Sequence, residues 1–61
     1  MSNVFIIRAD ENISFNYVSE LIKDHKHIQI IMKGDESKAL ELLRFLTELY
    51  PSKSITLIIE R

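Results

Sequence analysis

The stretch HIQIIMKGDESKALELLRFLTELYPSKSITLII, residues 27–59, decides the fold of this chain. Its first part, 27–32, alternates apolar side chains in the way that is typical of a strand. Gly34 and Asp35 then interrupt the run, and Asp35 is a good N-cap because its side chain can accept from free amides of a first helical turn. A wide apolar stripe at helical spacing predicts a helix over 36–50.

Pro51 marks the end of that helix, because proline cannot continue the helical hydrogen-bond ladder. The β-branched run at 54–59 predicts a second strand. Residues 27–59 therefore form a strand-helix-strand unit, which implies a parallel pair of strands joined by a crossover.

The segment before residue 27 repeats the same order of elements. Residues 3–8 form a β-branched and aromatic run that predicts a strand, and 9–14 is a polar, acidic loop. Asn12 or Ser14 caps a helix that we expect to end near residues 24–25. The whole chain, 1–61, is thus predicted to be one α/β domain with two layers (α+β two-layer). The predicted element order is β-α-β-α-β, with two helices on one face of a three-stranded sheet.

Composition places the chain among small intracellular domains that need an added stabilising contact. With 61 residues, a domain is marginally stable alone, and small domains are usually completed by disulfides, a metal or a partner. The sequence has no cysteine and only two histidines, so oligomerisation remains. No apolar run is long enough to span a bilayer, and the net charge of -1 does not favour a nucleic-acid partner. We expect a cytoplasmic protein without a cofactor.

Both faces of the predicted strands carry apolar side chains, which favours an interface. We expect the helix-facing set to be Val4, Ile6, Ile28, Ile30, Ile55, Leu57 and Ile59. The opposite set would then be Phe5, Ile7, Ile31 and Ile58, and a contiguous apolar patch on such a face is more often an interface than solvated surface. Leu40 and Phe45 flank the apolar stripe of the second helix, and we expect them to be interface residues as well. The alternative is that the stripe is simply broad.

The polar clusters of the chain give little support to catalysis or metal binding. His25 and His27 could share a cation if the backbone between them were extended, but a polar turn is the favoured interpretation because further ligands are lacking. The acidic pairs at 10–11 and 35–36 are expected to be loop or capping residues. Gly34 is solitary, so no phosphate-binding glycine loop is present. We expect a protein that is not an enzyme.

Lys33 and Lys38 bracket the start of the second helix, where amide donors and lysines could meet a phosphate. The alternative is that they are ordinary surface lysines, which the acidic Asp35 and Glu36 between them favour.

The order of elements and three tripeptides resemble the Alba family of small dimeric DNA- and RNA-binding proteins. Asn16-Tyr17-Val18 opens the first helix, Ser37-Lys38-Ala39 opens the second after Gly34, and Pro51-Ser52-Lys53 leads into the last isoleucine-rich strand. The resemblance covers most of the chain and implies a homodimer, or a heterodimer with a related chain, and the fold that the family shares with a translation-factor C-terminal domain. It also implies nucleic-acid backbone contacts, for which the candidates are Arg8, Tyr17, Lys33 and Lys38.

Two departures from the family pattern oppose nucleic-acid binding. Asp10 and Glu11 occupy the loop where the family carries a lysine pair, and carboxylates repel phosphate. The sequence stops at Arg61, where the family's basic hairpin and last strand would begin, so we expect an open sheet edge or a rearranged strand order. Two hypotheses therefore stand. The protein is either an Alba-like dimer that binds the phosphate backbone of DNA or RNA weakly, or an interaction module of the same fold that has lost this binding.

Overall fold

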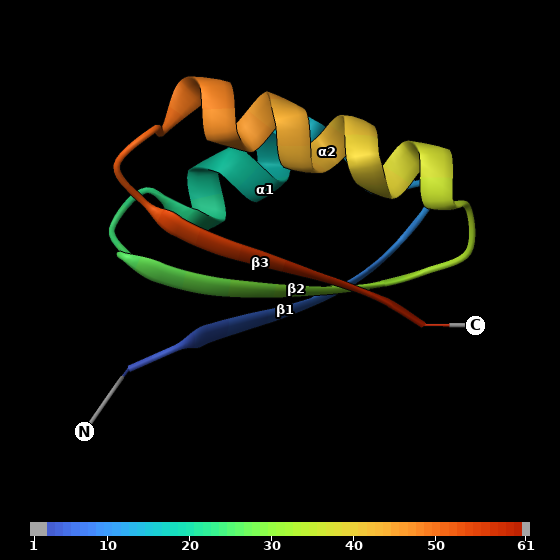
Figure 1. Ribbon diagram of the computed structural model, residues 1–61, viewed down its shortest axis with the longest axis horizontal. Helices are drawn as coiled ribbons and strands as arrows, with labels where there is room; N and C mark the ends of the chain where they lie inside the picture. Colours follow the sequence, from blue (N-terminus) through green and yellow to red (C-terminus); the bar gives the residue numbers. More distant parts are fainter. Residues whose placement is uncertain (1–2, 61) are drawn as a thin grey trace.

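A computed structural model describes residues 3–60 as a three-stranded sheet with two helices on one face (Figure 1). The elements follow one another as β1 (Phe5–Asp10), α1 (Phe15–Ile22), β2 (His27–Lys33), α2 (Glu36–Leu49) and β3 (Ser54–Glu60). The predicted β-α-β-α-β two-layer sandwich is therefore confirmed.

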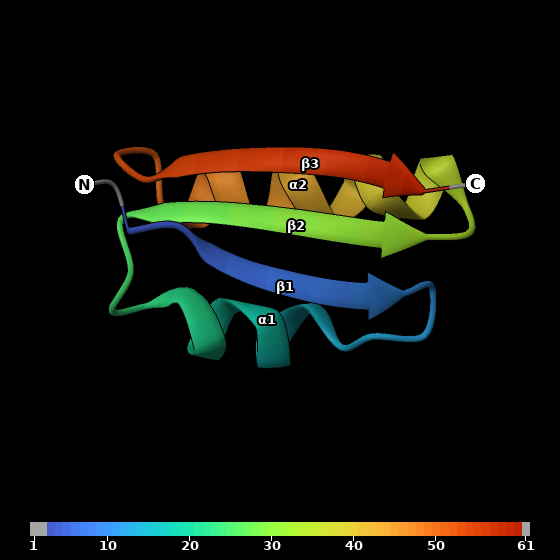
Figure 2. The same cartoon turned by 90° about the horizontal axis from the view of Figure 1, so that it is seen from below.

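The sheet is parallel throughout, and its strand order, β1-β2-β3, follows the chain. Because both helices lie on the same face, the two crossovers have the same hand, as expected for parallel strands. Seen from the open face of the sheet, α2 lies behind β2 and β3, and α1 lies beside β1 (Figure 2). This arrangement makes β2 the central strand and leaves β1 and β3 at the edges.

Helix α1 starts as predicted but is shorter than predicted. Of the two candidate caps, Ser14 acts as the N-cap, and its side-chain oxygen accepts from the Tyr17 amide at 3.3 Å. The helix ends at Ile22, short of residues 24–25, and the His25 amide then donates to the Ile22 carbonyl at 3.0 Å. No apolar residue follows Ile22 before β2, so a longer helix would bury nothing more.

Helix α2 is delimited by local signals. Asp35 caps it by accepting from the Ser37 amide at 2.9 Å, as predicted. Gly34 precedes the cap with a φ of 114°, a backbone conformation that side chains with a Cβ rarely adopt. The helix ends at Leu49, directly before the Tyr50–Pro51 step.

The core lies between the sheet and the helices and is built around β2. The helix-facing side chains of β2 are fully buried, and they meet the apolar faces of α1 and α2. The buried hydrophobic residues are Ile7, Val18, Ile22, Ile28, Ile30, Met32, Ala39, Leu42 and Leu46.

The two faces of β1 are the reverse of those predicted from the sequence. Ile7 belongs to the buried core and Phe5 packs against it, so neither faces away from the helices. Val4 and Ile6, which were expected under the helices, are 46% and 55% exposed. Because all four residues are apolar, the alternation between positions 4 and 7 does not distinguish the two faces.

The charged end of β1 fixes its orientation. The strand spans Phe5–Asp10, whereas 3–8 was predicted, so Arg8 and Asp10 are both strand residues. They share a side with Ile6, because side chains alternate along a strand. Burying two charges would cost far more than exposing Ile6, so this side faces water.

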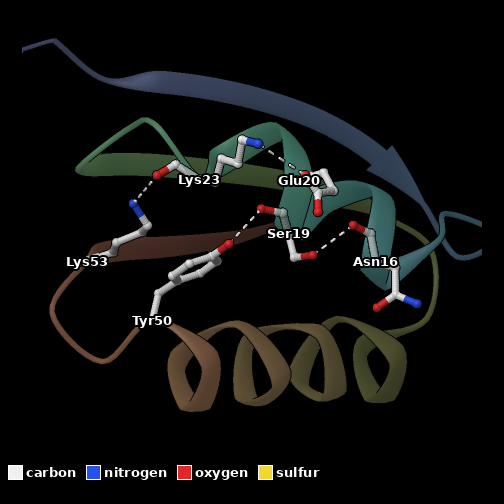
Figure 3. Close-up of polar contacts among 6 residues, drawn as sticks. All are labelled: Asn16, Ser19, Glu20, Lys23, Tyr50 and Lys53. Atoms are coloured by element: carbon white, nitrogen blue, oxygen red, sulfur yellow. Dashed lines mark hydrogen bonds and ion pairs between the residues drawn. The ribbon is translucent and has the colours of Figure 1, made fainter.

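The turn between α2 and β3 satisfies backbone carbonyls at the end of α1 (Figure 3). The Tyr50 hydroxyl donates to the Ser19 carbonyl at 3.1 Å. The Lys53 ammonium group donates to the Lys23 carbonyl at 3.0 Å and to the His25 carbonyl at 2.6 Å. A cation is favourable there because the carbonyl end of a helix carries partial negative charge. These contacts join two segments about 30 residues apart, and they give Lys53 a structural role.

Removing the Tyr50 hydroxyl should weaken this connection without changing the fold. Tyr50→Phe keeps the ring and loses one part-buried hydrogen bond, which should lower the free energy of unfolding by about 1 kcal/mol. Urea denaturation followed by circular dichroism measures this change. Tyr17→Phe is the matched control, because Tyr17 is exposed, and equal losses in the two variants would contradict the assignment.

Candidate interaction surface

The helix-facing side of β3 is incompletely covered. Each of its apolar residues pairs in register with a fully buried residue of β2, such as Leu57 with Ile30. The β3 side chains are nevertheless only half-buried; they are Ile55, Leu57 and Ile59. The difference arises because β2 has a neighbouring strand on both sides and β3 has one on a single side.

The backbone of β3 also presents unpaired groups. The Ser54 amide donates to the Lys26 carbonyl at 2.9 Å, so the backbone of Ser54 points toward β2. Successive residues of a strand point their amide and carbonyl groups to alternate sides, so those of Ile55, Leu57 and Ile59 point outward. Within residues 3–60 no strand pairs with this edge, which makes it a template for strand addition.

Helix α2 extends the same surface above the edge. Its Phe45 ring lies 5.7 Å from the Phe15 ring, and the Lys38 ammonium lies 5.7 Å from the same ring, so this side of α2 faces α1. At 100° per residue, Leu40 and Leu43 lie on the opposite side, toward β3. Leu40 is 53% exposed, as its prediction as an interface residue requires. This side carries a shallow depression of about 570 Å³, lined by Ser37, Leu40, Glu41, Leu43, Arg44 and Thr47.

We call this region the β3-edge surface. It consists of the outward backbone and half-buried side chains of Ile55, Leu57 and Ile59, together with Leu40, Leu43 and Thr47 of α2. An open edge was one of the two alternatives expected from the sequence, but the partial exposure of Ile55, Leu57 and Ile59 was not expected. That exposure depends on which strand lies at the edge of the sheet, a feature that no local pattern encodes.

The outer face of the sheet is less apolar than predicted. Ile31 and Ile58 do lie there, paired in register, and Ile58 is 40% exposed. Ile6 lies on the outer face, where Phe5 and Ile7 were expected. Its register partners across the sheet are polar: Gln29 in β2 and, next to it, Thr56 in β3. The next row places Arg8 beside Ile31. The exposed apolar side chains are thus interspersed with polar and charged ones.

The two predicted interface aromatics already have partners within the chain. Phe5 stacks on His25 with ring centroids 3.9 Å apart and an interplanar angle of 3°. Phe45 packs against Phe15 and so joins α2 to α1. Both rings are half-buried, and both contribute to packing around the core.

The four candidate nucleic-acid residues do not form one basic surface. Arg8 and Lys33 line a shallow depression on the outer face, but Asp10 and Glu60 line it as well. The Arg8 guanidinium lies 3.8 Å from the Glu60 carboxylate.

Lys38 and Tyr17 are on the helical layer and not on the outer face. Lys38 approaches Phe15, whereas Tyr17 is 58% exposed on α1. Glu11, in the turn after β1, adds a further negative charge, because its carboxylate lies near Gly34, the residue after Lys33. A phosphate backbone that approached the outer face would therefore meet two cations, those of Arg8 and Lys33, beside two carboxylates. The other two candidate residues lie in the helical layer.

Among residues 3–60, no group of three histidine, cysteine, aspartate or glutamate residues is placed to hold a metal ion. No helix in that range is long and apolar enough to cross a membrane. Comparison with protein-family models, with curated proteins and with solved structures found no match for this chain.

Proposed function

We propose that the protein is a non-enzymatic interaction module of the cytoplasm, which binds another protein strand along the β3-edge surface. One observation carries this proposal: the helix-facing apolar side chains of β3 stay half-buried, although their register partners in β2 are fully buried. An edge with unpaired backbone groups and uncovered apolar side chains favours strand addition, in which main-chain hydrogen bonds supply affinity and side-chain pockets supply specificity.

Charge favours this function over nucleic-acid binding. Backbone binding to DNA or RNA requires several cations that face the phosphates together. Arg8 is paired with Glu60, and Lys33 shares its depression with Asp10 and Glu60. The resemblance to the Alba family supports an assembling module of this fold, while the arrangement of these charges opposes the family's nucleic-acid role.

A strand peptide and a nucleic-acid duplex, compared as probes, test the proposal. We expect saturable binding of a fluorescent peptide with the sequence of Ser54–Glu60, measured by anisotropy, because it can complete the open edge. We expect no binding of a labelled duplex even at low salt, where phosphate contacts are strongest.

The control peptide carries an N-methyl group on the residue equivalent to Leu57, which removes one main-chain donor and blocks close pairing. It should bind far more weakly than the unmodified peptide. Duplex binding that weakens steeply with salt, without peptide binding, would overturn the proposal in favour of the nucleic-acid function.

A further inference from the structure

We propose that the strand that completes the β3 edge is the β3 strand of a second copy of this chain. The two strands run antiparallel about a two-fold axis at Leu57 and join two three-stranded sheets into one. This inference rests on the proposed function, and it adds the identity of the partner and the register of pairing.

The sequence of β3 is complementary to itself in this register. Pairing about Leu57 places Leu57 opposite Leu57 of the second copy, and Ile55 opposite Ile59, so that every helix-facing pair is apolar. Glu60 is the only charged residue of the strand, and it lies opposite Ser54. The full length of β3 is paired, and no like charges are opposed.

The neighbouring registers are less favourable. A shift of the two-fold axis to Thr56 places Lys53 opposite Ile59 and shortens the apolar overlap. A shift to Ile58 leaves Ile55 opposite no residue of β3 and places Glu60 opposite Thr56. Only the Leu57 register covers all three half-buried side chains of the edge.

The backbone is oriented correctly for this pairing. The amide and carbonyl of Leu57 point outward, since those of Ser54 point toward β2. In an antiparallel ladder, two such residues face each other as a hydrogen-bonded pair and exchange both bonds. The two-fold axis can therefore pass through the Leu57 pair without rotating either strand.

The helical layer can close at the same time. A two-fold axis perpendicular to the sheet keeps both copies of α2 on one face and makes them antiparallel. Strands lie about 4.8 Å apart, so a helix seated over β2 and β3 lies about 5 Å from the axis, and the two helices about 10 Å apart. This separation is ordinary for packed helices.

The side chains of α2 match across the same axis. The helix spans Glu36–Leu49 and β3 spans Ser54–Glu60, so the middle of α2, near Leu43, lies over Leu57. Leu43 then meets its own copy, and Leu40 meets Thr47.

A cysteine substitution tests the register, because the natural sequence has no cysteine. Hydrogen-bonded antiparallel partners have Cα atoms about 5.5 Å apart, which a disulfide can span. Leu57→Cys should therefore form a covalent dimer under mild oxidation. Thr56→Cys is the matched control: it lies opposite Ile58, so we expect it to cross-link about tenfold less. Equal cross-linking of the two variants would overturn the register.

Sedimentation equilibrium of the full chain tests the dimer independently of any substitution. We expect twice the chain mass, and we expect the chain mass when Leu57 is N-methylated by chemical synthesis, which leaves its side chain and the β2–β3 ladder unchanged. A monomeric unmodified chain that still binds the β3 peptide would overturn this inference and leave the proposed function standing. A monomer that binds no peptide would overturn both. A dimer that Ile31→Lys dissociates and N-methylation does not would place the interface on the outer face instead.

Discussion

Ile7→Lys should abolish folding, whereas Ile6→Lys should leave the domain folded. The two isoleucines are neighbours in β1, but Ile7 is 6% exposed in the core and Ile6 is 55% exposed on the outer face. An unpaired ammonium group buried beneath α1 and α2 costs several kcal/mol. A domain of this size has a total stability of about 3–5 kcal/mol, so the substitution should exceed what the fold can tolerate.

Circular dichroism and thermal melting of the two variants measure this difference. Ile7→Lys should show no cooperative transition. Ile6→Lys should have a free energy of unfolding within about 0.5 kcal/mol of that of the natural chain. The reverse result, an unfolded Ile6→Lys and a folded Ile7→Lys, would mean that β1 presents the faces that alternation alone suggested.

Leu42→Ala should cost about 2–5 kcal/mol of unfolding free energy, the range for a large-to-small change in a closed core. Leu42 is fully buried between α2 and the sheet, where β2 and the two helices prevent the site from collapsing around a cavity. For a domain of marginal stability, a loss of this size leaves a large unfolded population at room temperature.

Leu49→Ala on the same helix is the matched control. Leu49 is 51% exposed, so its truncation removes less buried area and should cost less than about 1 kcal/mol. Urea denaturation of both variants at one chain concentration gives the comparison, because concentration would otherwise change the contribution of any dimer. Similar losses for the two leucines would contradict the position of the core beneath α2.

Local chemistry accounts for the parts of the fold that were predicted correctly. The cap at Asp35, the positive φ of Gly34 and the stop at Pro51 each depend on a few adjacent atoms, so the limits of α2 can be inferred without knowledge of its neighbours. Alternation between strands and helices then required a parallel sheet with crossovers.

The face of β1 could not be inferred from its apolar residues. Val4 to Ile7 are all apolar, and a shift of one residue exchanges the two faces. The signal that would have identified the buried face is the charge of Arg8 and Asp10, which continue the strand on the side of Ile6. The predicted strand ended at Arg8, so Asp10 was not counted as a strand residue and could not indicate which face of the strand is exposed.

The candidate surface required the tertiary structure. Ile30 and Leu57 have similar sequence environments, yet one is fully buried and the other half-buried, because strand order makes β2 central and β3 an edge. The cations at Arg8 and Lys33 likewise looked available in sequence, and only the sheet register brings Asp10 and Glu60 beside them.

The sequence by itself determined the order of strands and helices, the limits of α2 and the two-layer class, because these depend on periodicity and on short-range backbone chemistry. Only the tertiary structure decided which side chains of β1 are buried, which strand is left at the edge, and which charges are neutralised. Those features depend on contacts between segments distant in the chain, and burial and charge neutralisation are properties of such contacts.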